Sequence, residues 1–269
     1  MSNQNTRDKT LLKVDNISVH FGGIVALDGV SFDVRRGEVR GLIGPNGAGK
    51  STLFNCLSRL YQCNAGSIYL DGVMLSQQPR HRIAALGVGR TFQNLALFRT
   101  MTVSENVMVG THAHHHSGFL QDALGLPSSA RAARQAREKA EKSIEFMGLA
   151  PFADKVVADL PFGTQKRVEL ARALATEPSL LLLDEPACGL NHEELVGLGD
   201  LIIDIQDRLQ MTVLLVEHHM SLVMRVCQRI VALNFGRKIA DGTPVEVRNH
   251  PDVIRAYLGD EGAQYDDAS

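Results

Sequence analysis

One glycine-rich run limits what this chain can fold into more than any other feature. It occupies 44–51 and reads Gly-Pro-Asn-Gly-Ala-Gly-Lys-Ser, which matches the pattern G-x-x-x-x-G-K-[ST]. An apolar strand is expected just before it, at Val39–Ile43, and helical spacing follows over Thr52–Leu60. In that setting the backbone curls so that several N–H groups point inward, and the helix N-terminus adds positive potential. The pattern therefore predicts a cradle for nucleotide phosphates.

The residues of this cradle have distinct expected roles. We expect the Lys50 ammonium to reach the β- and γ-phosphates of ATP and the Ser51 hydroxyl to bind Mg²⁺. A glycine-rich turn that binds nothing is the alternative, and the complete motif between a strand and a helix argues against it. The predicted contacts to the nucleotide in this stretch are Gly44, Pro45, Asn46, Gly47, Ala48, Gly49, Lys50, Ser51 and Thr52.

An apolar stretch that ends in two acids supplies the expected second half of the site. Four consecutive leucines, Leu180–Leu183, predict a buried strand. Asp184 is then held rigidly at the carboxyl end of that strand, beside the Mg²⁺ ion. Glu185, one residue further, is expected to polarise the water that attacks the γ-phosphate. The alternative role for Glu185 is that of a carboxylate at a helix start near Pro186. The acid pair is strong evidence for a nucleotide site only together with the cradle.

The order of the expected elements indicates an α/β fold. From Gln165 onward, helices alternate with apolar strands, which predicts a mostly parallel sheet covered by helices. Between about 95 and 160 the spacing is helical. The expected strands are Leu11–Val19, Val30–Val34, Val39–Ile43, Ser67–Leu70, Leu180–Leu183, Thr212–Val216 and Ile230–Leu233.

A long helix is predicted in the middle of the chain from small and apolar residues at intervals of three and four. Ser128 or Ser129 is expected to cap its start, and Gly148 to end it. A last helix is expected over Glu246–Leu258, followed by an acidic, frayed tail over 260–269. The residues expected on one face of the middle helix are Ala133, Ala136, Ala140, Ile144 and Met147.

Composition argues against two classes of function. With 28 Lys and Arg against 30 Asp and Glu, the net charge is −2, so the basic excess of a nucleic-acid binder is missing. No apolar run approaches the roughly 20 residues of a membrane-spanning helix, and the polar N-terminus does not resemble a secretory signal. If a membrane is involved, another chain must span it. Four cysteines without CxxC spacing predict reduced, mostly buried thiols in a reducing compartment.

A histidine-rich stretch before Gly118 suggests a metal site at first sight. Its members are His112, His114, His115 and His116. They lack acidic or cysteine partners nearby, so we expect solvated side chains on an exposed loop instead.

Five further motifs, taken together, resemble those of the ABC ATPases. The run 160–167 reads Leu-Pro-Phe-Gly-Thr-Gln-Lys-Arg and resembles the LSGGQ signature helix, in its usual place upstream of the acidic strand. Gln93, in Arg-Thr-Phe-Gln, resembles the Q-loop glutamine, and Gly189–Asn191 occupies the D-loop position. His218, after an apolar strand, resembles the switch histidine, and Phe21 stands where the family stacks an aromatic ring on adenine.

The resemblance implies a role for each of these residues. Phe21 would stack on adenine, although it is also compatible with a core aromatic. Gln93 would contact Mg²⁺ or the attacking water, against the alternative of a surface turn. His218 would hydrogen-bond the γ-phosphate, with His219 as a rival for that role. Gly163 would present its N–H, at a helix start, to the nucleotide of a partner subunit.

The resemblance also implies an architecture and a set of partners. The expected fold is a P-loop NTPase with a mainly parallel core, an antiparallel β subdomain and an inserted helical subdomain over about 95–160. A single ABC ATPase domain would span 11–259. Two such subunits, as a homodimer or with a paralogous chain, would enclose two ATP. They would drive transmembrane permease subunits from the cytoplasmic face of the inner membrane, served indirectly by a periplasmic or extracellular binding protein.

Departures from the general ABC pattern suggest a subgroup. Pro161 replaces the usual signature serine, Phe162 the first glycine and Thr164 the glutamine, while Asn191 replaces the D-loop aspartate. A proline-aromatic-glycine signature with Gly-Leu-Asn resembles the ATPases of branched-chain amino-acid importers. The stretch Gly-Thr-Pro-Val-Glu-Val over 242–247 agrees with that group.

Other functions stay open beside this one. A lipopolysaccharide exporter ATPase shares the aromatic-glycine signature, and amide or urea importers are close as well. A soluble ABC ATPase of DNA repair or translation usually carries a long coiled coil, zinc-binding insertions or a second nucleotide domain, and none fits here. A non-hydrolysing nucleotide-binding regulator is disfavoured by intact Lys50, Asp184 and Glu185.

Overall fold

The computed structural model describes residues 10–93, 95–112 and 127–263, and divides into two compact units. The first unit takes in Met1–Ile83 and Leu182–Ser269, and the second Ala84–Leu181. Part of the histidine-rich stretch, 114–116, lies outside the described residues, as does 264–269 of the expected acidic tail.

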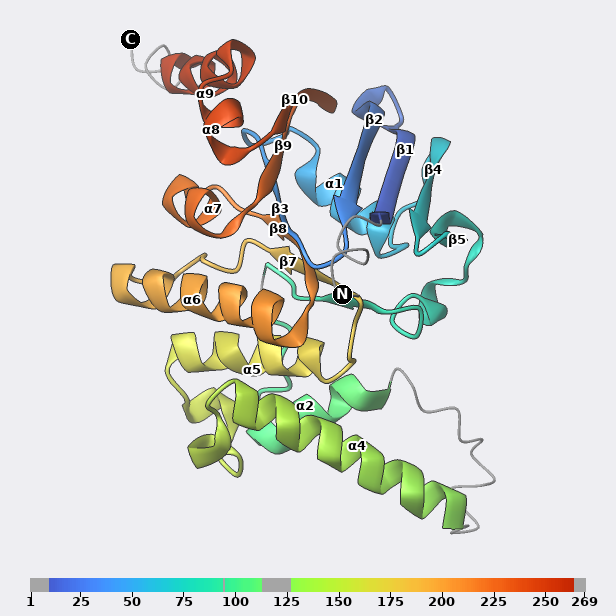
Figure 1. Cartoon of the computed structure of the whole chain (residues 1–269), viewed down its shortest axis with the longest axis vertical. Coiled ribbons are helices and arrows are strands. Elements are labelled where there is room, and N and C mark those ends of the chain that lie inside the picture. The colour runs from blue at the N-terminus through green and yellow to red at the C-terminus, as the bar shows by residue number, and fades with distance from the viewer. Residues whose placement is uncertain (1–9, 94, 113–126, 264–269) are drawn as a thin grey trace, which may run out of the picture. The chain divides into compact units, whose positions relative to one another are not determined.

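An antiparallel sheet in the first unit has the strand order β2-β1-β4-β5, as expected for the β subdomain (Figure 1). Its strands are β1 (Thr10–Phe21), β2 (Ile24–Arg35), β4 (Ala65–Leu70) and β5 (Val73–Met74). The sequence predicts a strand only from Val30 to Val34, but β2 begins at Ile24 and runs through Asp28 and Gly29. Gly29 adopts a φ of +66°, and the register with β1 shifts nearby, so the glycine forms an irregularity within the strand rather than a turn.

The larger sheet has the order β10-β9-β3-β8-β7-β6. Strand β3 runs parallel to both β8 and β9, and β10 runs antiparallel to β9. Every residue of β3, β7 and β8 is buried, which fits their mainly apolar sequences, although Arg40, Asp184 and Thr212 are buried with them. The expected α/β class is confirmed, although β5, β6 and β10 were not predicted. The strand bounds are β3 (Val39–Ile43), β6 (Val88–Arg90), β7 (Leu180–Asp184), β8 (Thr212–Val216), β9 (Arg229–Asn234) and β10 (Arg237–Gly242).

Two helix predictions for the first unit are wrong in their bounds. Helix α1 spans Lys50–Leu57 and stops short of Leu60, because Arg59 takes a left-handed φ of +58° and the chain folds back. The expected helix over 246–258 is two helices, α8 (Pro244–Arg248) and α9 (Pro251–Ala263). Pro251 has no N–H to continue α8, and its fixed φ suits the first turn of a new helix. Helix α9 takes in part of the stretch expected as frayed tail. The other α-helices in the described part of this unit are α6 (His192–Leu209) and α7 (Met220–Val226).

In the described part of the second unit, the helices α2 (Val103–Thr111), α4 (Pro127–Phe146) and α5 (Phe162–Leu174) pack against one another (Figure 1). Helix α4 begins at Pro127, so Ser128 and Ser129 lie inside its first turn and the predicted serine cap is wrong. A proline at the start satisfies the same need, since it has no N–H to leave unpaired. Gly148, with a φ of +65°, ends the helix as expected.

The buried face of α4 follows the predicted spacing with one exception. Ala136, Ala140, Ile144 and Met147 are all at most 5% exposed, whereas Ala133 is exposed. No helix in the described part of the chain is both long and apolar enough to cross a membrane. Of the four free cysteines two are buried, one is half-buried and Cys188 is exposed, so the expectation of mostly buried thiols holds only in part.

Candidate functional site

The cradle over 44–51 lies between β3 and α1, as the sequence predicts. Two of its glycines are required by geometry. Gly44 has a φ of +152°, and a side chain there would collide with the Leu233 carbonyl. Gly49 has a φ of +99°, and a Cβ there would lie 2.6 Å from the Ala26 carbonyl oxygen. The loop is therefore packed tightly against β2 and β9, and only glycine fits at both positions.

Lys50 starts helix α1 and is 7% exposed. Its Nζ donates to the carbonyl oxygens of Gly44, at 2.6 Å, and Pro45, at 2.9 Å. These bonds hold the ammonium across the loop. Ser51 follows in the first turn and is exposed, so its hydroxyl is accessible to a ligand.

The acidic pair ends β7. Asp184 is the last residue of that strand and is 6% exposed, whereas Glu185 is half-buried. Glu185 takes a left-handed φ of +47°, uncommon for a side chain of this size, so the chain turns sharply there. Its N–H donates to the Val216 carbonyl at 2.9 Å, which ties this turn to the end of β8. The Asp184 carboxylate and the Ser51 hydroxyl are oxygen donors, the ligand type that Mg²⁺ prefers.

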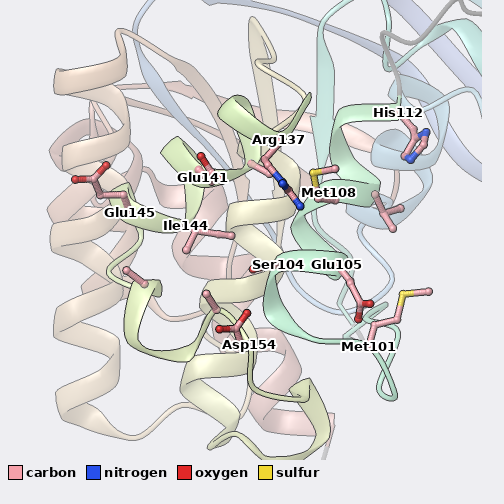
Figure 2. Close-up of a pocket in the computed structure, with 14 residues that line it drawn as sticks. Met101, Ser104, Glu105, Met108, His112, Arg137, Glu141, Ile144, Glu145 and Asp154 are labelled. Carbon is pink, nitrogen blue, oxygen red and sulfur yellow. The ribbon is translucent and has the colours of Figure 1, made fainter. Parts of the chain in front are cut away.

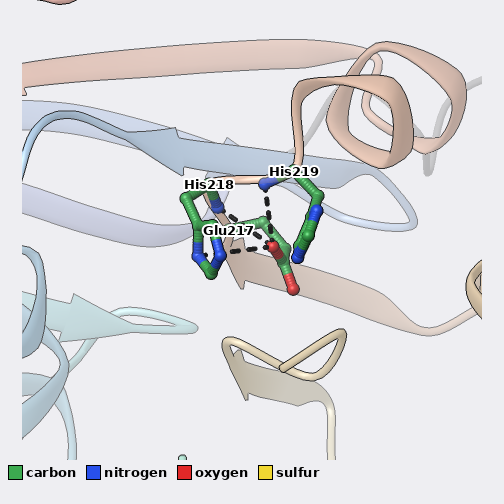
Figure 3. A group of neighbouring side chains, drawn as sticks. All are labelled: Glu217, His218 and His219. Carbon is green, nitrogen blue, oxygen red and sulfur yellow. Dashed lines mark hydrogen bonds and ion pairs between the residues drawn. The ribbon is translucent and has the colours of Figure 1, made fainter. Parts of the chain in front are cut away.

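The loop after β8 carries both candidate switch histidines (Figure 3). The His218 side chain is 51% exposed, and His219 is half-buried at the N-cap of α7. Their rings lie 4.4 Å apart between centroids. Sequence reasoning missed Glu217, a fully buried carboxylate just before them. The available signal was a charged residue directly after five apolar or β-branched residues of a buried strand.

Phe21 is the last residue of β1 and is 45% exposed. Its ring meets that of Tyr61 edge to face, with centroids 5.2 Å apart. The exposure argues against the core-aromatic alternative and leaves a face of the ring open to stacking.

Gln93 belongs to the second unit, where it is exposed. The segment around it is anchored to α5. The Phe92 N–H donates to Glu169 Oε1 at 3.1 Å, and Arg172 donates to the Ala96 carbonyl at 2.6 Å. Burial raises the pKa of Glu169, although the Phe92 hydrogen bond opposes the shift, and burial lowers the pKa of the Arg172 guanidinium. The signature helix and the Q-loop segment are thus fastened to each other.

Gly163 lies in the first turn of α5, after the N-cap residue Pro161. No side chain caps this helix, so the N–H groups of its first turn are available to an acceptor. Phe162 beside it is 45% exposed, and the Lys166 ammonium lies 5.6 Å from the centroid of its ring.

The structure brings most of the expected site together in the first unit. Strands β3, β7 and β8 end at one edge of the sheet, because β3 and β8 are parallel and the turn after β7 bonds to Val216. That edge carries the cradle, the acidic pair and His218. Gln93 and Gly163 are the two expected residues that lie in the second unit.

Comparison with known proteins agrees with this geometry. The family model described as ABC transporter matches residues 27–188. The chain belongs to the ABC transporter family of ATP-binding cassettes. A second model, described as branched-chain amino acid ATP-binding cassette transporter, matches residues 237–263. Membership and the intact cradle identify the chain as an ATPase that binds ATP, and confirm the predicted P-loop NTPase fold.

Individual relatives cover almost the whole cassette. The high-affinity branched-chain amino acid transport ATP-binding protein BraF of Pseudomonas aeruginosa is 44% identical over 94% of this chain and 99% of its own. The lipopolysaccharide export system ATP-binding protein LptB of Haemophilus influenzae is 34% identical over 94% and 98%. Among solved structures, the ADP conformation of MJ1267, an ATP-binding cassette of an ABC transporter, has a TM-score of 0.81 at 29% identity, covering 93% of this chain and 99% of that one.

Proposed function

We propose that this cassette is the ATP-hydrolysing subunit of an importer of branched-chain amino acids, peripheral to the membrane on its cytoplasmic face. The observation that carries the proposal is the match of residues 237–263 to the branched-chain family model. That segment lies beyond the general cassette match, which ends at residue 188, so it supplies information on the subgroup. BraF, named for branched-chain transport, is also more similar than LptB, named for lipopolysaccharide export.

Nucleotide binding follows from the cradle. The phosphates of ATP accept hydrogen bonds from its N–H groups, Lys50 pairs with the β- and γ-phosphates, and the adenine stacks on Phe21. Ser51 and Asp184 would hold Mg²⁺, with Gln93 as a further oxygen ligand. When bound, that ion would neutralise charge on the phosphates.

In this proposal, hydrolysis uses a general base and a group that hydrogen-bonds the γ-phosphate. Glu185 accepts a proton from water as the water oxygen attacks the γ-phosphorus, and the bond from that phosphorus to the β-phosphate oxygen breaks. His218 donates a hydrogen bond to the γ-phosphate. The anchoring of Glu185 to β8 supports this assignment, because a base must be held in place to act.

The working unit in this proposal is a pair of cassettes, either two copies of the chain or this chain with a paralogous subunit. Each ATP is held between one subunit's cradle and the other's signature helix, where the uncapped N–H groups around Gly163 meet the γ-phosphate. A binding protein outside the cytoplasm would act on this pair only through the permease.

A groove in the second unit suits the contact with a permease. It has a volume of about 800 Å³ and lies between α2, α4 and the turn after α4 (Figure 2). Met101, Met108 and Val109 line one side, and Ala140 and Ile144 of α4 the other. Figure 2 shows Arg137 reaching from α4 toward Met108.

The charges around the groove indicate what it receives. Four acidic residues line it against one arginine and one histidine, namely Glu105, Glu141, Glu145 and Asp154 against Arg137 and His112. An apolar floor with an acidic rim fits an amphipathic helix with basic edges. We propose that a cytoplasmic helix of the permease has this character.

Lipopolysaccharide export is the second candidate, favoured by the similarity to LptB, and amide or urea import is a third. Reconstitution distinguishes them. The chain should co-purify with permease subunits of a branched-chain importer, and its ATPase activity in vesicles should rise when a binding protein loaded with leucine, isoleucine or valine is added. Stimulation only by lipopolysaccharide, or only by an amide- or urea-loaded binding protein, would overturn the assignment.

A matched pair of valine substitutions tests the groove. Val109→Glu puts a carboxylate on the groove floor, whereas Val196→Glu puts one at a similarly exposed valine on α6 (36% and 43% exposed). We expect only the first to lose co-purification with the permease, with ATP binding by the isolated chain unchanged in both. Equal behaviour of the two variants would remove the groove from the interface.

A further inference from the structure

A buried carboxylate at the end of β8 is not used by the chemistry described so far. Glu217 follows directly after Val216 and has 0% of its surface exposed. A carboxylate without solvent must find its hydrogen-bond partners inside the protein. The partners of Glu217 come from two separate loops, and Figure 3 shows those in its own loop, His218 and His219.

Three main-chain N–H groups converge on this one side chain. Ala187, two residues after Glu185, donates to Oε1 at 2.8 Å. His218 and His219 donate to Oε2 at 2.9 and 3.1 Å. The His218 Nδ1 atom also lies 3.9 Å from Oε2, so the carboxylate faces the imidazole as well as its amide.

The geometry points to Glu217 as a positioning residue for ATP hydrolysis. Its two oxygens lock the loop that carries Glu185 to the loop that carries His218, so that the base and the γ-phosphate contact keep a fixed separation. A main-chain hydrogen bond from the Glu185 N–H to the Val216 carbonyl also joins the two segments. The parts of the loops that follow these two residues are held together by the hydrogen bonds to the Glu217 side chain. The inference rests on the roles proposed above for Glu185 and His218.

The chemistry of this position requires a carboxylate. Three donors point at it, and a carboxylate has acceptor sites on both oxygens. A glutamine of the same shape has one oxygen and one NH₂ group, so at least one loop would face a donor instead of an acceptor. An aspartate is one methylene shorter and cannot reach both loops from the same backbone.

Glu217, His218 and His219 also lie close enough together to be considered as ligands of a metal ion. The hydrogen bonds of the Glu217 carboxylate argue against that role. Ligand atoms of Glu217, His218 and His219 lie within 4.8 Å of one another, the one such group of three found among the described residues. The carboxylate, however, already accepts three N–H bonds at 2.8–3.1 Å and is closed to solvent. We therefore assign it to holding the two loops.

The test is Glu217→Gln in the assembled transporter, with kcat and the Kd for ATP measured separately. We expect kcat to fall by roughly 10- to 100-fold, the scale of a displaced catalytic group, with Kd within about twofold because the cradle is untouched. Glu38→Gln is the matched control. Glu38 is also buried, at 8% exposed, and accepts the Arg35 N–H at 2.8 Å, but it precedes β3 at the end away from the cradle. Its kcat should stay within about twofold of wild type. A normal kcat for Glu217→Gln, or an equal loss in both variants, would overturn the inference.

A double-mutant cycle separates positioning from general support. If Glu217 acts through Glu185, then Glu217→Gln should add less than about threefold to the loss already caused by Glu185→Gln, because residues that act as a unit are not additive. Fully multiplicative losses of kcat would contradict the inference.

Failure of the positioning role can be distinguished from failure of the proposed function. If Glu185→Gln and His218→Ala both keep wild-type turnover, the assigned roles fail; if both lose it while Glu217→Gln does not, only the positioning role fails.

Hydrogen exchange on the wild-type protein tests the hydrogen bonds to Glu217 even if Glu217→Gln does not fold. The amides of Ala187, His218 and His219 should be protected although they lie in loops, since each donates to Glu217. Exchange of these amides at the rate of an open loop would mean that the hydrogen bonds to Glu217 do not persist in solution, and the inference would be wrong.

Discussion

The N–H of Glu185 donates a 2.9 Å hydrogen bond to the carbonyl oxygen of Val216, so the turn after β7 is fastened to the last residue of β8. The acid that should activate water is therefore held by a neighbouring strand of the same sheet. Directly after this bonded N–H, the left-handed φ of +47° at Glu185 turns the chain sharply.

Replacing this acid tests its role as the base. Glu185→Gln keeps the shape of the side chain but cannot accept the proton, so turnover should fall by roughly 10²–10⁴ while ATP binding stays nearly intact. An ATP-bound dimer should accumulate. Glu193→Gln, an exposed acid in the first turn of α6, serves as the control. Turnover within a few-fold of wild type in the assembled transporter would remove Glu185 from the base role.

The cradle lysine should matter already in the ground state. Lys50→Ala removes an ammonium that is held across the phosphate-binding loop by two carbonyl oxygens. The affinity for ATP itself should therefore drop, because the charge is adjacent to the phosphates before as well as during the reaction. Titration of the isolated chain measures this, with Lys13→Ala at a half-exposed surface lysine as the control. Unchanged affinity with lost turnover would mean that Lys50 acts only in the transition state.

Features that depend on residues close together in the chain could be predicted from the sequence, and contacts between distant segments could not. The cradle and the acidic strand were predictable because Gly44, Gly49 and the four leucines are required by local backbone geometry and burial. Glu217 was not, because its partners come from Ala187 as well as its own loop, and such a pairing exists only once β7 and β8 are in place.

The misplaced helix boundaries have a different cause, because the residues that decide them lie within the local sequence. Local periodicity continues past Leu57 into Leu60, but the turn that ends α1 is decided by the left-handed Arg59. At the other end of the chain, a prediction that spans 246–258 overlooks Pro251, whose physical effect on a helix is strong enough to have been used.

An ion-pair cluster in the first unit gives stability a pH dependence. Asp241 on β10 accepts from Arg40 at 2.5 Å and from Arg229 at 3.0 Å, and Lys238 lies 3.5 Å away. Burial acts to raise the pKa of Asp241, but the attraction of Arg40 and the other cations lowers it below the usual 3.8 overall. A carboxyl with a depressed folded pKa adds stability at pH values above about 3.8, and this contribution is lost as the pH falls through the folded pKa.

Asp241→Asn should therefore destabilise at neutral pH. Arg40, whose side chain is 4% exposed, would lose its closest partner, at a cost of about 2–3 kcal/mol, within the range for a hydrogen bond between charged groups. Urea unfolding at pH 7 measures the loss, and the gap to wild type should narrow below pH 4. Asp200→Asn, which breaks a pair whose acid is 64% exposed, should cost under about 1 kcal/mol. A gap for Asp241→Asn that is constant with pH would show that the charge of Asp241 is not the cause.

The thiols should react in the order of their exposure. Cys188 is exposed, whereas Cys227 is 6% exposed and burial raises the pKa of its thiol to about 12. At pH 8 only about one Cys227 in ten thousand would then be a thiolate. Iodoacetamide labelling followed by peptide mass spectrometry should modify Cys188 in the native protein and Cys227 only in urea. Fast native labelling of Cys227 would contradict its burial between β3 and α7, where its Sγ would lie 3.0 Å from a Cβ at Gly41.

The signature helix provides the test that separates a two-subunit site from a self-contained one. Gly163→Asp places a carboxylate in the uncapped first turn of α5, where we propose that the partner's γ-phosphate binds. Added bulk and like-charge repulsion should prevent closure of the dimer, yet the monomer should still bind ATP through its own cradle. Gly197→Asp adds the same side chain on α6 where a Cβ meets nothing within 4 Å, and it should close normally.

Mixing two defective subunits should then restore part of the function. A dimer that joins Gly163→Asp to Lys50→Ala has one composite site with both lesions and one with neither, if each site takes its cradle from one chain and its signature helix from the other. ATP-dependent closure of this mixed dimer, followed by size-exclusion chromatography or crosslinking, should exceed that of either mutant homodimer. The reason is geometric, since the intact site pairs the cradle of the Gly163→Asp chain with the signature helix of the Lys50→Ala chain. Closure no better than that of the homodimers, or loss of ATP binding by the Gly163→Asp monomer, would mean that Gly163 serves its own subunit's nucleotide or none.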